Sequence, residues 1–319
     1  MSILGFLPVA LFLLGLLYLD SFKLVPLRRL MILIVIGCAA AALSLAINNA
    51  MLAAGMQRKT LMQFGAPVVE EIVKAIPIFW MLRTRRVGFL IDAAICGFAV
   101  GAGFALAENL YYLSTLAKAP PALWVVRGFG TAIMHGGTTA IFAIVGKSRQ
   151  SIIGLVVAMA IHSMFNHFIL SPAMTTLLTV IIFPPLVVLA FARSERLLQQ
   201  WLGNGFDVDA ALLRAMRSGQ FADSHAGQYL QSLREHFEGA VLADMFCYLQ
   251  LHAELSLRAK GVLMLRESGF PVAKDVEVAE KLRELRYLKD SIGKTGELAL
   301  LPLMHHAPAD LWQLQVLGG

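Results

Sequence analysis

The chain is poor in charged residues. Only 15% of its 319 residues are Asp, Glu, Lys or Arg, and 58% are hydrophobic, whereas a soluble domain usually has about 25% charged residues. This shortage argues against a soluble protein and predicts a membrane protein. The net charge of +6 does not indicate nucleic-acid binding, because no basic face with interleaved aromatic residues is present.

Cysteine is scarce as well. The three cysteines, Cys38, Cys96 and Cys247, are far apart in the chain, and two of them lie inside apolar runs. Their spacing fits neither a disulfide framework nor a metal-binding knuckle, so we interpret them as reduced thiols.

What the sequence does contain is a series of long apolar runs. Runs of roughly 17–25 residues are long enough to cross a bilayer as helices, and about seven are present. They are Ile3–Leu19, Leu30 to about Ala54, Ala66–Leu82, Phe89 to about Ala117, Ala122–Gly146, Ile152–Leu170 and Ala173–Ala192. The sequence therefore predicts an all-α protein: a polytopic membrane helical bundle at 1–192, followed by a soluble helical domain at 193–319.

Positive charge is distributed unevenly between the loops. The loops after the first, third, fifth and seventh runs hold ten Lys and Arg residues, and the alternate loops hold three. Because Lys and Arg are enriched in cytoplasmic loops, we expect the N-terminus outside and the C-terminal domain in the cytoplasm.

The segment after residue 192 has a different composition. Helical periodicity with charged faces predicts long helices at Gly239–Gly269 and Ala273–Gly293, and a turn-rich stretch is expected at Leu202–Asp207. The segment carries no motif with evident chemistry, and its sequence does not identify a cytoplasmic partner.

Several polar and ionisable residues lie within the apolar runs, where a charge costs a few kcal/mol and usually has a function. Four runs carry them: Glu70, Glu71 and Lys74; Glu108 and Asn109; Arg127 and His135; His162 and Asn166. Counted at about 1.5 Å per residue from the helix ends, most lie in the outer half of the membrane and His135 lies near its midplane. Gly101, Gly103, Gly136 and Gly137 would let the helices that carry them approach closely.

Each of these residues also has a structural interpretation. Glu70 and Lys74 are spaced i, i+4 and suit a structural ion pair. His135 alone is typical of a buried hydrogen-bonding residue, Asn166 alone of a contact between helices, and Arg127 is near enough to the interface to extend towards water. Three carboxylates, two histidines and an asparagine in one region are harder to explain as helix contacts alone.

Such a group has the parts needed to hydrolyse an amide. Two nearby carboxylates in a low-dielectric site can share a proton, a carboxylate or imidazole can activate water, and imidazole and amide groups can stabilise an oxyanion. A serine mechanism is disfavoured, because Ser163 lies on the wrong face to pair with its neighbour His162.

Three short motifs carry a resemblance to a known family. "EEIVK" matches EExxK, "FALAE" matches FxxxE and precedes Asn109, and "HSMFN" matches HxxxN. In this order, on consecutive helices over about Arg58 to Leu170, they resemble the PrsW family of intramembrane proteases, relatives of the CAAX-prenyl endopeptidase (ABI) superfamily. The resemblance implies a bacterial multi-pass protease of the cytoplasmic membrane that cleaves a membrane-tethered substrate, such as an anti-sigma factor, near the outer face during regulated proteolysis. The related prenyl proteases have His where this chain has Glu108.

On this resemblance, Glu70 is expected to act as general base with Glu108 as its proton-sharing partner. Glu71 and Lys74 would position the base, and His162 and Asn166 would bind the oxyanion. His135 would be a polar wall or a metal ligand.

Two alternatives for the chemistry stay open beside the glutamate mechanism, for which no cofactor is expected, and a structural receptor that acts through its C-terminal tail is a further option. In a zinc version, His135, His162 and Glu108 would bind the ion and leave a position for water, although the chain has no HExxH motif. The other alternative is a proton-coupled transporter, since such proteins also carry intramembrane Glu, Lys and His. Transporters commonly have repeated halves, which this sequence does not show.

Overall fold

The computed structural model describes residues 2–20, 22–115, 124, 126–167, 169, 171–272, 276–304 and 317. Over these residues the chain is helical and contains no β-strand, so the predicted all-α class is confirmed. The chain divides into two compact units, Met1–Glu195 and Arg196–Gly319.

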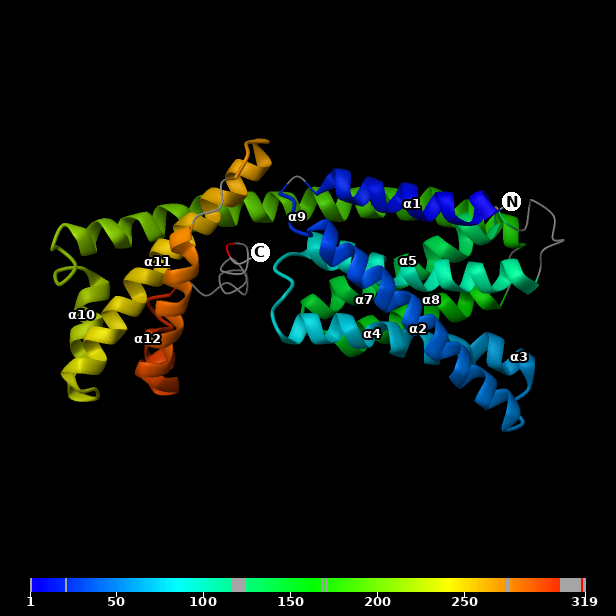
Figure 1. The fold of residues 1–319 in the computed structure, drawn as a ribbon, viewed down its shortest axis with the longest axis horizontal. Helices are drawn as coiled ribbons and strands as arrows, with labels where there is room; N and C mark the ends of the chain where they lie inside the picture. The colour runs from blue at the N-terminus through cyan, green and yellow to red at the C-terminus, as the bar shows by residue number, and fades with distance from the viewer. Residues whose placement is uncertain are drawn as a thin grey trace. The chain divides into compact units, whose positions relative to one another are not determined.

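The first unit is a bundle of helices that run alongside one another (Figure 1). Its elements are α1 (Ser2–Leu19), α2 (Leu27–Ala53), α3 (Arg58–Thr60), the π-helix η1 (Leu61–Gly65), α4 (Ala66–Arg83), α5 (Leu90–Thr115), the π-helix η2 (Val126–Thr131), α7 (Ala132–Lys147), α8 (Ser151–Asn166) and the start of α9 (Pro172–Arg217). Each of the seven predicted apolar runs thus contains a helix.

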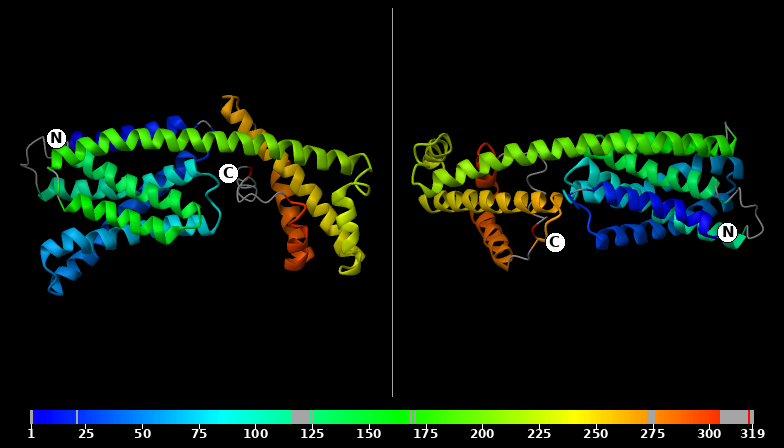
Figure 2. Two further views of the ribbon diagram at one scale, coloured as in Figure 1. Left: turned by 180° about the vertical axis from the view of Figure 1, so that it is seen from behind. Right: turned by 90° about the horizontal axis from the view of Figure 1, so that it is seen from above.

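Helix α5 forms the centre of this bundle and packs between α2 and α7. Helix α8 packs on α7, and α4 contacts α2, α7 and α8; Figure 2 shows the same bundle from behind and from above. A Cβ at Gly103 would collide with the backbone oxygen of Ile34 on α2, and a Cβ at Gly101 with that of His135 on α7. These glycines therefore permit the close helix contacts that the sequence predicted.

Four helices among the described residues are long and apolar enough to cross a membrane. They are Leu27–Ala53, Leu90–Tyr112, Phe129–Lys147 and Thr176–Arg217, and shorter apolar helices lie at Leu7–Tyr18 and Ser151–Asn166. Helix α4 carries Glu70, Glu71 and Lys74 within 18 residues, which lowers its apolar character. Seven crossings therefore stay a prediction.

Two π-helices interrupt the regular helical geometry beside the polar residues. η1 leads into α4, and η2 leads into α7, which becomes α-helical only at Ala132. The depth expected for His135 assumes a regular α-helix from Ala122, whereas the structure has a π-helix at Val126–Thr131.

The second unit contains the rest of α9, followed by α10 (His225–Ser232), η3 (Leu233–Glu235), α11 (Gly239–Glu267) and α12 (Val276–Leu300). Helices α11 and α12 pack together over a core that includes Met245, Leu249 and Leu255. Both predicted helices are confirmed. α11 ends before Gly269, which has φ 75°, and the backbone of α12 breaks at Gly293, with φ 64°.

The turn predicted at Leu202–Asp207 is wrong, because this stretch lies within α9. Gly203 and Gly205 each cost about 1 kcal/mol in a helix relative to alanine. Leu198 and Leu202 lie one turn apart, and both are buried. Burying their side chains favours the helix by more than the glycines disfavour it.

Candidate functional site

The first unit contains a partly open cavity of about 780 Å³ beside the predicted polar residues. Five of the predicted site residues line it: Glu70, Glu108, His135, His162 and Asn166. They come from α4, α5, α7 and α8, so the structure brings together side chains that are up to 96 positions apart in the sequence.

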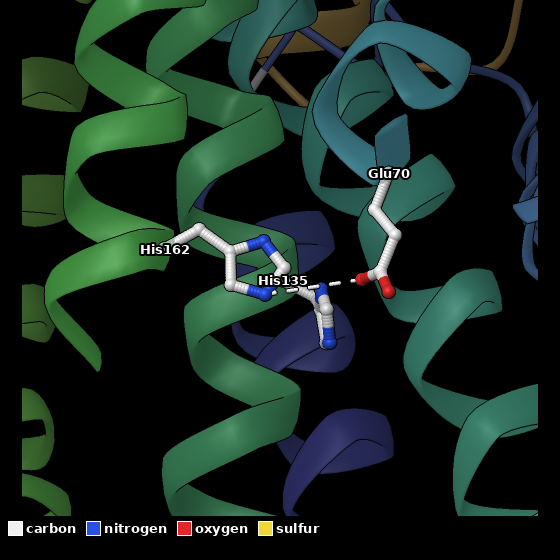
Figure 3. A group of neighbouring side chains, drawn as sticks. All are labelled: Glu70, His135 and His162. Carbon is white, nitrogen blue, oxygen red and sulfur yellow. Dashed lines mark ion pairs between the residues drawn. The ribbon is translucent and has the colours of Figure 1, made fainter. Parts of the chain in front are cut away.

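Glu70, His135 and His162 form a group of neighbouring side chains on the cavity wall (Figure 3). One potential ligand atom from each residue lies within 4.8 Å of the others. His162 Nε2 is 3.8 Å from Glu70 Oε2, and the two imidazole rings meet edge to face with their centroids 4.9 Å apart. A carboxylate and two imidazoles therefore point into one small space.

Glu71 lies behind this group and is almost completely buried, with 2% of its surface exposed. Its Oε1 accepts hydrogen bonds from Lys74 Nζ at 2.7 Å, from Thr138 Oγ1 at 3.1 Å and from His162 Nδ1 at 2.8 Å. With Nδ1 protonated and held by Glu71, a neutral His162 ring presents the lone pair of Nε2 towards Glu70.

Lys74 is fully buried and connects Glu71 to His135. Its ammonium forms an ion pair with Glu71, three residues away, instead of the i, i+4 pair expected with Glu70. It also lies 3.1 Å from His135 Nδ1. Since an ammonium can only donate, Nδ1 of His135 accepts, and in the neutral ring Nε2–H then donates to Glu108 Oε2 at 3.1 Å.

The HSMFN segment fixes the π-helix η1 with two side chains. Ser163 Oγ donates to the backbone oxygen of Gln63 at 2.6 Å, and Asn166 Nδ2 donates to that of Met62 at 2.9 Å. The Ser163 hydroxyl is therefore directed towards η1. The Asn166 amide has a second N–H, and Asn166 also lines the cavity.

Two further residues, Asn109 and Arg127, are predicted to support the site. Asn109 is fully buried beside Glu108 and is not among the described residues that line the cavity. Arg127 belongs to η2, but its side chain lies outside the part of the structure that is described, and its predicted role stays untested.

The structure adds two polar residues that sequence reasoning missed. Asn48 on α2 donates through Nδ2 to Glu70 Oε1 at 3.2 Å, and Thr138 on α7 donates to Glu71. Each supports one of the two adjacent glutamates. The only available signal was a polar residue in an apolar run, in "AINNAM" and "HGGTTA", and such residues are common at contacts between helices.

The donor set fits a zinc ion. Two histidines and a carboxylate are a known set of three protein ligands for catalytic zinc, and two ligands of one tetrahedral zinc lie roughly 3.4 Å apart. The 3.8 Å between His162 Nε2 and Glu70 Oε2 is near this spacing, and Glu71 supplies the carboxylate that typically holds a metal-binding histidine. The carboxylate in this group is Glu70, whereas the sequence-based zinc set used Glu108.

Comparison with known protein families gives a match to the membrane part of the chain. The family model described as "PrsW family intramembrane metalloprotease" matches residues 25–190, which span α2 to α8 and part of α9 and include every residue of the group. No curated protein and no solved structure matches the chain. The description as a metalloprotease does not support the sequence-based preference for a metal-free glutamate mechanism.

Proposed function

The chain belongs to the PrsW family of intramembrane metalloproteases, and from this membership we propose that it hydrolyses a peptide bond of a membrane-tethered protein in the cavity of the first unit. The observation that carries the proposal is the group of Glu70, His135 and His162, whose ligand atoms lie within 4.8 Å of one another on the cavity wall. The protein is a membrane protein with several apolar helices.

In this proposal Glu70, His135 and His162 would hold a zinc ion. Such an ion would supply Lewis acidity to the reaction. Glu70 then serves as a ligand, and not as the general base that a metal-free site would require. Both nitrogens of His135 have partners, Lys74 and Glu108, so coordination through Nε2 would release Glu108 from this contact.

Glu108 is the residue that we assign to proton transfer. Its side chain is 25% exposed and lines the cavity beside His135. It would accept a proton from the attacking water as the C–O bond forms, and would return that proton to the amine nitrogen as the C–N bond breaks. The second N–H of Asn166 would stabilise the oxyanion that develops between these steps.

Glu71 and Lys74 act as positioning residues in this scheme. Glu71 holds the Nδ1–H of His162, and Lys74 both neutralises Glu71 and holds His135. Because all three groups are buried, this network keeps the two rings oriented while the cavity itself stays open for a substrate.

We extend the proposal to the biological setting that the motifs suggested. The substrate is a tethered regulatory protein of the anti-sigma-factor kind, cut near the outer face of a bacterial cytoplasmic membrane, and the second unit is a cytoplasmic domain. A relation to the CAAX-prenyl endopeptidases follows from the same motifs. The charge difference between the loops supports this orientation.

The test is cleavage of a single-span reporter peptide by the purified protein in proteoliposomes. Glu70→Gln and His162→Ala should each lower the rate by at least about 100-fold, with expression and unfolding temperature close to those of the parent. Ser163→Ala is the matched control. Ser163 is the neighbour of His162 on α8, but its side chain contacts η1, so this variant should keep most of the activity. Full activity in both Glu70→Gln and Glu71→Gln would overturn the assignment.

A further inference from the structure

Helix α2 contributes a wall of the cavity although it carries none of the three motifs. Its cavity face has the i, i+3, i+4 spacing of one side of a helix. The residues on this face include Ala41, Ser44, Leu45, Asn48 and Leu52. Three polar residues of α2 line the cavity, Ser44, Asn48 and Asn49, and of these Ser44 and Asn48 lie one turn apart.

Ser44 and Asn48 both hold oxygen atoms that lack a hydrogen-bond partner within the described part of the chain. Ser44 is 1% exposed, and its Oγ is buried and unpaired. Asn48 uses Nδ2 to hold Glu70, but its Oδ1 is also buried and unpaired. Buried polar atoms without partners destabilise a protein, and each one in a native fold requires an explanation.

The position of these atoms suggests what they bind. Asn48 Nδ2 donates to Glu70. Because the unpaired Oδ1 belongs to the same amide group, it also lies close to the proposed reacting centre. Residues i and i+4 of a helix are about 6 Å apart along its axis, and every second residue of an extended chain repeats at about 6.6–6.8 Å. The spacing of main-chain groups along one edge of an extended peptide would therefore match the spacing of Ser44 and Asn48.

A protease inside a membrane requires such partners. A helical substrate has its backbone N–H and C=O groups paired internally, and unwinding the helix around the scissile bond leaves these groups unsatisfied in an apolar medium. A site that pairs them would favour the unwound segment over the intact helix.

We propose that Ser44 and Asn48 form a docking site for the main chain of the substrate, which binds in an extended conformation along α2. Asn48 Oδ1 accepts a hydrogen bond from a backbone N–H, and the Ser44 hydroxyl donates to a carbonyl two residues away. The preferred substrate class is a membrane span that is interrupted by helix-breaking residues near the cut. The inference rests on the proposed protease function.

The test measures binding separately from cleavage. The full-length protein, made inactive by His162→Ala, is titrated in nanodiscs with two fluorescent single-span peptides. One has a leucine-rich helical span. The other has the same span with a four-glycine segment placed one turn from one end, and it is made in two versions, one for each end. The extended-segment peptide should bind more tightly, and Ser44→Ala or Asn48→Ala should each reduce this preference by about 2- to 10-fold.

Three controls separate docking from a structural role. Cys38→Ala removes another hydrogen-bonding side chain of α2, one that donates to the Gly103 oxygen outside the cavity, and should leave the preference unchanged. The Ser44→Ala variant should unfold at the same or a higher temperature than the parent, because removing Ser44 Oγ breaks no hydrogen bond within the described residues. Replacing one amide of the glycine segment by an ester should weaken binding in the parent and not in Asn48→Ala.

The outcomes also separate this inference from the proposed function. An unchanged peptide preference in both Ser44→Ala and Asn48→Ala would overturn the docking site, whether or not the parent cleaves its reporter. A reduced preference together with no cleavage by the parent would support the docking site and reject the protease.

Discussion

At the scale of single residues, the two adjacent glutamates of α4 have different roles. Consecutive residues on a helix point about 100° apart, so Glu70 faces the cavity while Glu71 faces the bundle. Glu71 accepts three hydrogen bonds and balances the charge of Lys74. The site therefore depends on a buried ion pair that does not itself touch the cavity.

Glu71→Gln should have two separable effects. It leaves the buried Lys74 ammonium without its counter-charge, which should destabilise the protein by about 3–5 kcal/mol. It also weakens the hold on His162, which should lower metal affinity by about 10- to 100-fold. The measurements are unfolding in detergent and metal titration.

The double variant Glu71→Gln/Lys74→Met provides the control, because it removes both buried charges. It should recover most of the lost stability while metal affinity and cleavage stay low. Recovery of activity together with stability would mean that Glu71 serves only to neutralise Lys74.

The charged members of the site could be predicted from sequence. Glu70, Glu71, Lys74 and Glu108 lie in apolar runs where a charge is costly, so they are conspicuous. Ser44, Asn48 and Thr138 could not be predicted in the same way, since uncharged polar residues in such runs are ordinary helix contacts. Which glutamate faces the cavity depends on how α4 is rotated, and spacing alone does not fix that rotation.

At the scale of helices, close contact between α5 and α7 sets the position of His135. The space for a Cβ at Gly101 is filled by the backbone oxygen of His135, so the helices touch directly at the site residue. The sequence predicted this closeness from its glycines. It did not predict the π-helices η1 and η2, because π-helices are rare and the hydrophobic pattern was compared with regular α-helices.

Gly101→Ala should therefore separate α5 from α7 and displace His135. We expect a lower unfolding temperature and at least about a tenfold loss of cleavage, since a small misplacement of reacting groups is costly. Gly15→Ala on α1 is the matched control, because no atom lies within 4 Å of its added Cβ. Equal activity in the two variants would show that the contact at Gly101 does not position the site.

At the scale of the whole molecule, the chain consists of two units, and the proposed chemistry lies entirely in the first. The all-α class and the long helices of the second unit followed from hydrophobic periodicity. The continuity of α9 did not, because its glycines suggested a turn while the burial of Leu198 and Leu202 favoured a helix.

The native cysteines offer a direct test of orientation. Cys247 in the second unit is exposed, whereas Cys96 is buried and Cys38 is partly buried in the first. If the second unit is cytoplasmic, a membrane-impermeant maleimide should label the protein only after the cells are permeabilised, and Cys247→Ser should abolish that labelling. Labelling of Cys247 in intact cells would place this unit outside.

The central claim is that Glu70, His135 and His162 together hold a catalytic metal. Its most direct test is the metal content of purified, cleavage-active protein, measured by mass spectrometry on the parent and on His162→Ala. The account predicts about one zinc ion per parent chain, the number that one such ligand set binds, and loss of that ion in the variant. Fully active parent protein that contains no bound metal would contradict it.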